Sequence, residues 1–167
     1  MVIVLSRRQL IWDEALTVLG IDARDIERDA DAAVCLSSWR RIARYLESQG
    51  RIPEAAEAWD WAVSEALEAD ELVAGQGQSA LWEASAFFER HEAMGSLRAT
   101  LEQAWASLRS GAPVPAEFVA RLLARLASVY ERLRMPERAA EATARAALIG
   151  ALVEPAAAPR RDVRRCA

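Results

Sequence analysis

The chain has 167 residues but no lysine, one histidine and two cysteines. Cys35 and Cys166 stand at no metal-ligand spacing and do not suggest a disulfide scaffold, so we expect Cys35 to be a small buried apolar residue. His91 has no cysteine, aspartate or second histidine at ligand spacing, and we expect it only to help end a helix. No nucleophile motif, glycine-rich phosphate loop or zinc signature occurs. The sequence therefore predicts no catalytic residue, no metal site and no cofactor, and we expect that the protein is not an enzyme.

Long apolar runs are also missing. No stretch approaches the roughly 18 apolar residues of a membrane-spanning helix. Residues 1–5 are apolar, but they are too few for the apolar region of a signal peptide and no charged residue precedes them. We therefore expect a cytoplasmic protein without a membrane partner.

Glycine and proline are scarce, with seven and six residues, and they lie mostly where helical patterns meet. Alanine, leucine, glutamate and arginine dominate, which is the composition of a helical protein. An apolar fraction of 53% with 28% charged residues is typical of a globular chain long enough to bury a core. The composition therefore favours an all-α fold.

All 21 basic residues are arginine. Arginine favours planar, bidentate contacts with carboxylates, but a GC-rich coding bias explains the missing lysine equally well. The net charge is −4, and residues 155–167 carry four arginines against one aspartate, a local charge of +3. The rest of the chain therefore carries −7, which argues against nucleic acid as the partner. We expect residues 154–167 to be a disordered arginine-rich tail.

An internal repeat is the strongest feature of the sequence. One unit reads Trp39-x2-Ile42-Ala43-x2-Leu46 and then Ala55-x3-Trp59-x2-Ala62. A second unit, 84 residues later, reads Leu123-x2-Leu126-Ala127-x2-Tyr130 and then Ala139-x3-Thr143-x2-Ala146. Because 84 is twice 42, a third unit is expected midway, and it is present as Leu81-x2-Ala84-Ser85-x2-Phe88 and Leu97-x3-Leu101-x2-Ala104. Small residues at 43, 85 and 127 let antiparallel helices approach closely, and large apolar residues at 46, 88 and 130 fill the space beside them.

This pattern resembles the tetratricopeptide repeat, and its 42-residue period is similar to the longer variant of kinesin light chains and many bacterial regulators. The resemblance covers about residues 36–150; an ordinary helical bundle with chance similarity is the alternative. It implies a short right-handed α-solenoid of three helical hairpins, with repeats near 36–77, 78–119 and 120–153 in a domain that spans 32–153. Residues 1–31 are expected to hold a helix, from Ser6 to Leu19, that packs on the first hairpin.

Periodicity and helix breakers predict the remaining helices. Gly50 is suited to end the first helix of a hairpin in the left-handed conformation, and Pro53 and Pro136 suit first helical turns. The expected helices cover residues 32–49, 53–70, 78–92, 95–109, 115–133 and 136–152.

The resemblance implies an adapter or scaffold that binds a polypeptide in the concave groove lined by the first helix of each hairpin. The groove residues predicted from the register are Arg40, Arg44, Trp82, Arg121, Arg125 and Ser128. Arginine pairs well with carboxylates, so the partner is expected to be an acidic protein or peptide. The alternative is that these arginines form internal ion pairs on a solvated face.

The six tryptophans are expected to differ in role. Trp39 and Trp59 occupy interior repeat positions, whereas Trp82 is expected to be an exposed aromatic anchor. Trp61 and Trp105 are expected to pack between neighbouring repeats.

A second possible interface lies at the C-terminal end, where no further helix is expected to cover the last hairpin. Leu148, Ile149 and Leu152 lie near the end of an alanine-rich helix that leaves room for another helix to approach. The alternative function is therefore a structural subunit or assembly factor of a larger complex, which forms a homo-oligomer or a hetero-complex through this helix.

Overall fold

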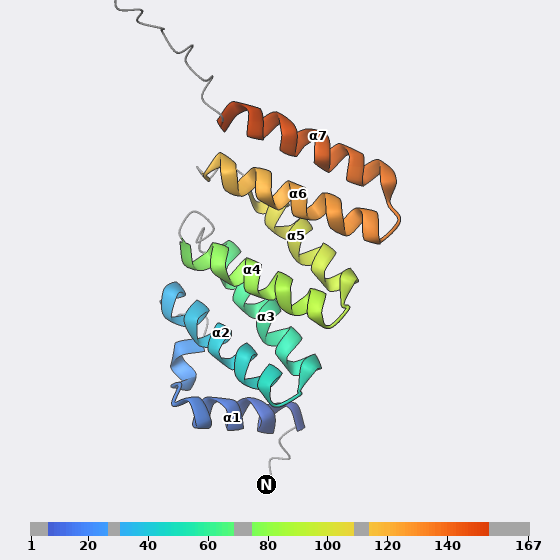
Figure 1. The fold of residues 1–167 in the computed structure, drawn as a ribbon. Coiled ribbons are helices and arrows are strands. Elements are labelled where there is room, and N and C mark those ends of the chain that lie inside the picture. Colours follow the sequence, from blue (N-terminus) through green and yellow to red (C-terminus); the bar gives the residue numbers. More distant parts are fainter. Residues whose placement is uncertain (1–6, 27–30, 69–74, 109–113, 154–167) are drawn as a thin grey trace, which may run out of the picture. The chain divides into compact units, whose positions relative to one another are not determined.

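The computed structural model describes residues 7–26, 31–68, 75–108 and 114–153, and these residues form helices and no strands (Figure 1). The elements are α1 (Arg7–Leu19), η1 (Ala23–Ile26), α2 (Ala32–Ser48), α3 (Ile52–Glu68), α4 (Gly75–Arg90), α5 (Met94–Leu108), α6 (Ala116–Arg132) and α7 (Pro136–Val153). The predicted all-α class and the predicted helices are confirmed, with boundaries that differ by a few residues. The expected tail, 154–167, lies outside the described residues.

The chain forms two compact units, residues 1–114 and 115–167. The first contains α1 to α5 and the second contains α6 and α7. The predicted repeat domain, 32–153, covers parts of both. The stacking of the third hairpin on the second, and with it the handedness of a complete solenoid, stays a prediction.

The 42-residue period is visible in the backbone. Three residues at this spacing adopt positive φ values directly after a first helix: Gly50 (70°), Glu92 (55°) and Arg134 (57°). In each hairpin the amide of the next residue donates to a carbonyl five positions back, at 2.9, 2.8 and 2.8 Å. This is the Schellman pattern that ends a helix. The three turns are therefore equivalent, although only the first contains the glycine that this conformation favours.

Each hairpin closes around the repeat positions that the sequence predicts. The small residues Ala43, Ser85 and Ala127 are all buried, and so are the large residues Leu46, Phe88 and Tyr130. A side chain no larger than alanine or serine permits close approach of two helices. The repeat pattern thus specifies how each pair of helices packs.

In the first unit the hairpins α2–α3 and α4–α5 stack in the same orientation. The first helices, α2 and α4, contact each other, and so do the second helices, α3 and α5 (Figure 1). A serial arrangement of this kind buries apolar surface between neighbours and not around one centre. It is the part of the solenoid that the structure describes.

Helix α1 packs on α2, as expected for an N-terminal capping helix. Ala15 is fully buried and Leu19 is half-buried, whereas the side chain of Leu10 lies outside the described residues. The Arg41 side chain donates to the carbonyl of Leu19 at 2.7 Å, and Arg51 forms an ion pair with Glu14 at 3.1 Å. These contacts connect the cap to α2 and to the turn that follows it.

The connection from α1 to α2 contains a short 3-10 helix, η1, which the sequence did not predict. Asp31 then accepts hydrogen bonds from the amides of Ala33 and Val34, at 3.0 and 3.2 Å, and so caps the N-terminus of α2. Ile21 is buried ahead of η1. The buried side chain of Ile21 and the hydrogen bonds of Asp31 therefore both help to fix the orientation of α2 after α1.

Candidate functional site

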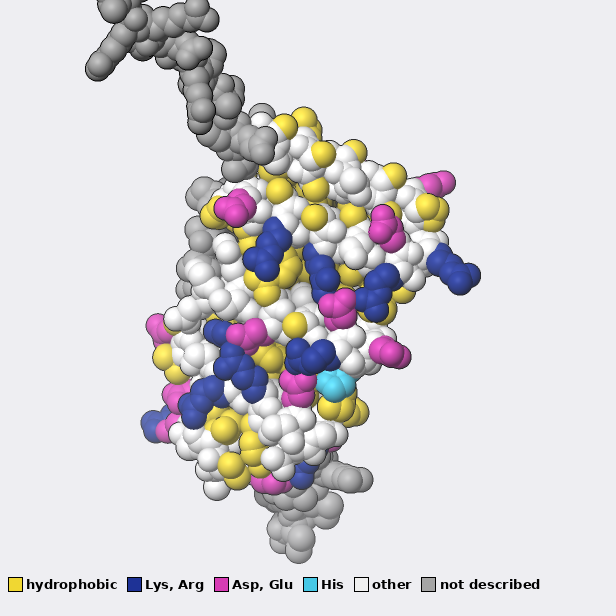
Figure 2. Space-filling model, in the orientation of Figure 1, with side chains coloured by type: hydrophobic (Ala, Val, Ile, Leu, Met, Phe, Trp, Pro, Cys, Tyr) yellow, Lys and Arg dark blue, Asp and Glu magenta, His cyan; other side chains and the backbone are white. Residues whose placement is uncertain are grey.

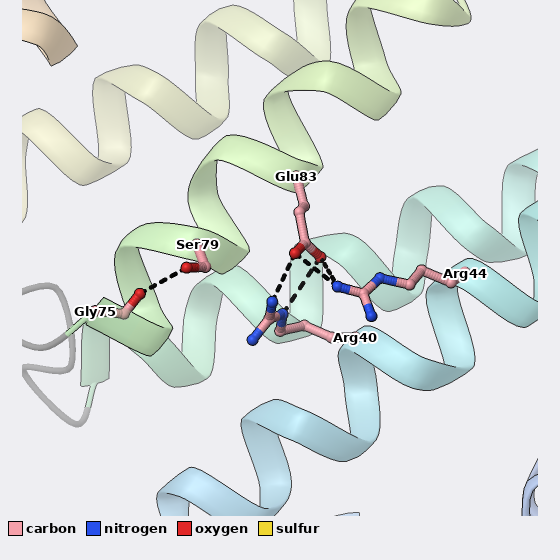
Figure 3. Close-up of polar contacts among 5 residues, drawn as sticks. All are labelled: Arg40, Arg44, Gly75, Ser79 and Glu83. Atoms are coloured by element: carbon pink, nitrogen blue, oxygen red, sulfur yellow. Dashed lines mark hydrogen bonds and ion pairs between the residues drawn. The ribbon is translucent and has the colours of Figure 1, made fainter.

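The predicted groove arginines of α2 are held by a carboxylate of α4. Glu83 accepts from Arg40 and from Arg44, each at 2.6 Å (Figure 3). The side chain of Arg40 is only 17% exposed and that of Glu83 is 31% exposed. Burial by itself would raise the pKa of Glu83, but the two guanidinium groups hold it below its ordinary value of 4.5. The geometry at these two arginines is that of internal ion pairs.

A second carboxylate joins the same two helices one turn further along. Glu47 of α2 accepts from Arg90 at 2.7 Å and lies 3.2 Å from Nε2 of His91. Burial would raise the pKa of Glu47, whereas the hydrogen bonds from Arg90 and His91 keep it below 4.5. The His91 ring also packs on Phe87, with centroids 4.7 Å apart. His91 follows the last residue of α4, as expected of a residue that helps to end a helix.

Figure 2 shows the resulting pattern on the face of α2 and α4, where arginine and acidic side chains lie next to each other. The two ion-pair groups lie between helices that are equivalent in successive repeats, so they reinforce the stacking described above. The charged side chains of this face therefore help to hold α2 and α4 together.

The other predicted groove residues are distributed as follows. Trp82 is half-buried and has an interaction partner, so the expected exposed anchor is not found at this position. Arg121 and Ser128 are exposed and Arg125 is half-buried on α6, which belongs to the second unit. A binding groove shared by all three hairpins stays a prediction.

Three other tryptophans come together in the first unit. Trp12 of α1 meets Trp39 of α2 edge-on, with centroids 5.4 Å apart and an interplanar angle of 86°. Trp39 in turn stacks on Trp61 of α3 at 6.0 Å and 19°. Trp61 remains 48% exposed. It was expected to pack between neighbouring repeats, but it lies instead within the first hairpin, beside the cap.

These rings line a pocket of about 510 Å³. The residues of this tryptophan pocket are Trp12, Ile26, Trp39, Glu57, Trp61, Ser64, Glu65 and Glu68. Five of them come from α3 at spacings that place them on one helical face. This spacing of five residues on one face of α3 can be seen in the sequence. It has no counterpart in the repeat pattern, however, and the site was predicted from the repeat pattern.

Cys35 of α2, a neighbour of the pocket residues Trp39 and Glu65, is buried with 1% exposure. Burial and, to a smaller extent, the Glu65 carboxylate raise the pKa of its thiol to about 11, while a hydrogen bond with Trp39 acts in the opposite direction. Cys35 is thus buried, as predicted, and a raised thiol pKa is typical of an unreactive cysteine. Its contacts with Glu65 and Trp39 attach two pocket residues to the core.

At the C-terminal end, the expected interface residues are partly visible. Leu148 is 67% exposed and Ile149 is half-buried, whereas the side chain of Leu152 lies outside the described residues. On α7, the described buried residues are Ala139 and Ala142. Within the second unit, most of the outer surface of α7 is therefore exposed to solvent or consists of small side chains.

Within the described ranges, no cluster of three or more histidine, cysteine, aspartate or glutamate side chains has the arrangement of a metal site. Among the same residues, no helix combines the length and apolar character needed to cross a membrane.

Comparison with known proteins identifies no family. No protein-family model matches the chain, and no curated protein does so. The solved structure of BtubC (BKLC) from P. vanneervenii aligns over 96% of this chain and 80% of that chain, with 13% sequence identity and a TM-score of 0.46.

Proposed function

We propose that the protein is an interaction module of the tetratricopeptide kind, an adapter or scaffold that binds a polypeptide partner. Its helical hairpins repeat with a 42-residue period in sequence and in turn geometry. Such repeats present side chains on extended surfaces that suit polypeptide partners. The observation that carries the proposal is the half-exposed Trp61 in the tryptophan pocket of the first unit.

Tryptophan is among the residues that contribute most to binding energy at interfaces, particularly in pockets that partners desolvate. The ring of Trp61 is already fixed by its stack on Trp39, so a partner loses little additional side-chain freedom on binding. A volume of about 510 Å³ also falls in the range typical of ligand pockets, roughly 300–1,000 Å³. Trp61 therefore has the properties of a preorganised anchor.

The groove face of α2 and α4 is a weaker candidate for the main contact. An acidic peptide would have to compete with Glu83, which is tethered and already accepts from both Arg40 and Arg44. Exchanging one carboxylate for another gains little, because each ion pair near the surface contributes only about 0–1 kcal/mol. We therefore place the principal contact at the tryptophan pocket and treat the groove as a secondary surface.

The test compares Trp61→Ala with a matched change of another tryptophan, Trp105→Ala, which lies on α5 and outside the pocket. Tagged versions of both variants and of the natural chain are isolated from the native cell, and the proteins that accompany them are quantified. We expect at least one partner to fall about ten-fold with Trp61→Ala and to persist with Trp105→Ala. Equal recovery of every partner from all three chains would contradict the proposal.

The alternative, a structural subunit bound through its C-terminal end, is favoured by the 67% exposure of Leu148. In that case Trp61→Ala leaves partner recovery unchanged, while a charge at position 148 abolishes it. The two variants therefore separate the two functions.

A further inference from the structure

We infer that the tryptophan pocket is a cation site, and that its occupant is the guanidinium group of an arginine carried by the partner polypeptide. This inference rests on the proposed function and adds the chemistry by which the partner is recognised. It reverses the charge expected of the partner, which the groove arginines had suggested to be acidic.

The pocket is lined by aromatic rings that suit a cation. A cation is attracted to the electron-rich face of a tryptophan ring, and guanidinium groups stack on such faces because they are planar. The rings of Trp39 and Trp61 are nearly parallel, whereas Trp12 stands almost perpendicular to Trp39. Trp61, at 48% exposure, offers a ring surface that its stack on Trp39 does not cover.

The charge of the pocket lining is acidic. Three glutamates, Glu57, Glu65 and Glu68, line the pocket, and among the described residues no arginine or histidine does so. These carboxylates lie on the α3 side of a pocket whose other lining includes three tryptophans and Ile26, and beside such apolar groups an electrostatic attraction is screened less than in bulk water. An acidic side chain would be repelled by them and a neutral one would gain at most a hydrogen bond, whereas a guanidinium group can pair with a carboxylate and stack on an indole at the same time.

The acidic and aromatic groups of the pocket are attached to regular structure and to the core. Glu65 interacts with the buried Cys35, which itself contacts Trp39, so an acidic and an aromatic wall share one anchor in the core. Glu57, Trp61, Glu65 and Glu68 all lie on α3, a helix of 17 residues. The site is thus built on regular structure and presents its aromatic and acidic groups together before a ligand arrives.

The test uses the full chain and two short peptides, acetyl-Gly-Arg-Gly-amide and the same peptide with citrulline in place of arginine. Citrulline has nearly the same shape but no charge, so the pair isolates the cation. Binding is followed through the indole signals in proton–nitrogen correlation NMR, with the signal of Trp61 assigned from a Trp61→Phe variant. We expect the arginine peptide to shift the signals of the pocket tryptophans saturably and to bind about ten-fold more tightly than the citrulline peptide.

Two variants place the site. Trp61→Ala and the double variant Glu65→Gln, Glu68→Gln should each weaken binding of the arginine peptide by about five- to ten-fold. Glu54→Gln is the matched control, because it removes a carboxylate from the same helix but not from the pocket. The NMR spectrum of each variant also reports whether the fold is retained, since Trp59 is a core residue that provides its own indole signal.

Several results would overturn the inference. Equal affinity for arginine and citrulline peptides would show that charge is not recognised, and arginine binding that all variants retain would place it elsewhere. Tighter binding of tetramethylammonium than of the arginine peptide would point to a free small cation. If neither peptide binds while capture of the cellular partner still depends on Trp61, the cation inference fails and the proposed interaction function stands.

Discussion

Gly50 and Arg134 lie 84 residues apart, and both adopt the left-handed backbone conformation, with φ of 70° and 57°. In each case the following amide, of Arg51 or Met135, donates to the carbonyl at the end of the preceding helix, of Leu46 or Tyr130. The conformation is the same, but the residue types are not equally suited to it, because a side chain at positive φ is strained and glycine is not.

We therefore predict that Arg134→Gly stabilises the second unit by about 0.5–1 kcal/mol and that Glu92→Gly does the same for the first unit. Gly50→Ala is the reverse experiment and should cost about 1 kcal/mol. No atom lies within 4 Å of the position that a Cβ of residue 50 would occupy, so this cost comes from backbone conformation and not from a clash. Calorimetric or urea unfolding measures all three; a loss of stability in Arg134→Gly would contradict the assignment of the turn.

The second prediction concerns the ion pairs of Glu83. Its pKa is lowered in the folded chain, so the stabilisation is fully present above the unfolded pKa of about 4.5 and is lost as the pH falls from there through the lower pKa of the folded state. At pH 7 we expect Glu83→Gln to reduce the free energy of unfolding by about 1 kcal/mol, because the group is partly exposed. Below the folded pKa, where Glu83 is protonated in both states, the variant and the natural chain should have nearly equal stability.

Urea unfolding at a series of pH values tests this. The control is Asp13→Asn, which removes an exposed carboxylate from the same unit without removing an ion pair seen in the structure. A difference between Glu83→Gln and the natural chain that does not change between pH 7 and pH 3 would mean that packing, and not charge, accounts for the effect.

The third prediction is that Cys35 is chemically silent. With a pKa of about 11, only about one thiol in a thousand is ionised at pH 8, and 1% exposure limits access to that fraction. In a Cys166→Ser chain, where Cys35 is the only thiol, we expect an aromatic disulfide reagent to react at least about 100-fold more slowly than with the same chain in urea. A rate close to that of the unfolded chain would mean that the region around Cys35 opens readily.

Much of the fold was predictable because its determinants are local. Helix boundaries follow from the apolar period and from residues such as Pro136, which starts α7 as expected. The helix expected at residues 78–92 begins three residues earlier, because Gly75 and Gly77 belong to α4 and Gly77 is buried there. Tertiary packing therefore overrode a weak local signal.

The candidate site was less predictable, because it depends on contacts between distant elements. The register correctly placed Arg40 and Arg44 on one face of α2 but gave no sign that Glu83, about 40 positions further along, would reach both. Trp12 stands outside the repeat, so its contact with Trp39 follows only from how the cap packs. Positions that recur in every repeat can be predicted from the 42-residue period, whereas a pocket that occurs in one hairpin only cannot.

The final prediction concerns α7 as a contact surface. Leu148 is 67% exposed, and its neighbours on the outer face include the exposed Ala144 and Ala147, whose small side chains allow another helix to approach closely. Alanine is only weakly apolar, so the competing view is that this surface is simply tolerated in water. Sedimentation velocity distinguishes the two. We expect the natural chain to self-associate, and we expect Leu148→Glu to raise the dissociation constant at least about ten-fold, since a carboxylate in an apolar contact must be desolvated. Helix content and thermal stability should not change, because the side chain is exposed.

Ser128→Glu adds the same charge to an exposed position of α6 and serves as the matched control. If Ser128→Glu dissociates the chains and Leu148→Glu does not, the contact lies on the predicted groove face and α7 is only a solvated end. A natural chain that stays monomeric at high concentration would contradict self-association, and the surface of α7 would then have to be tested against the cellular partner with the same two variants.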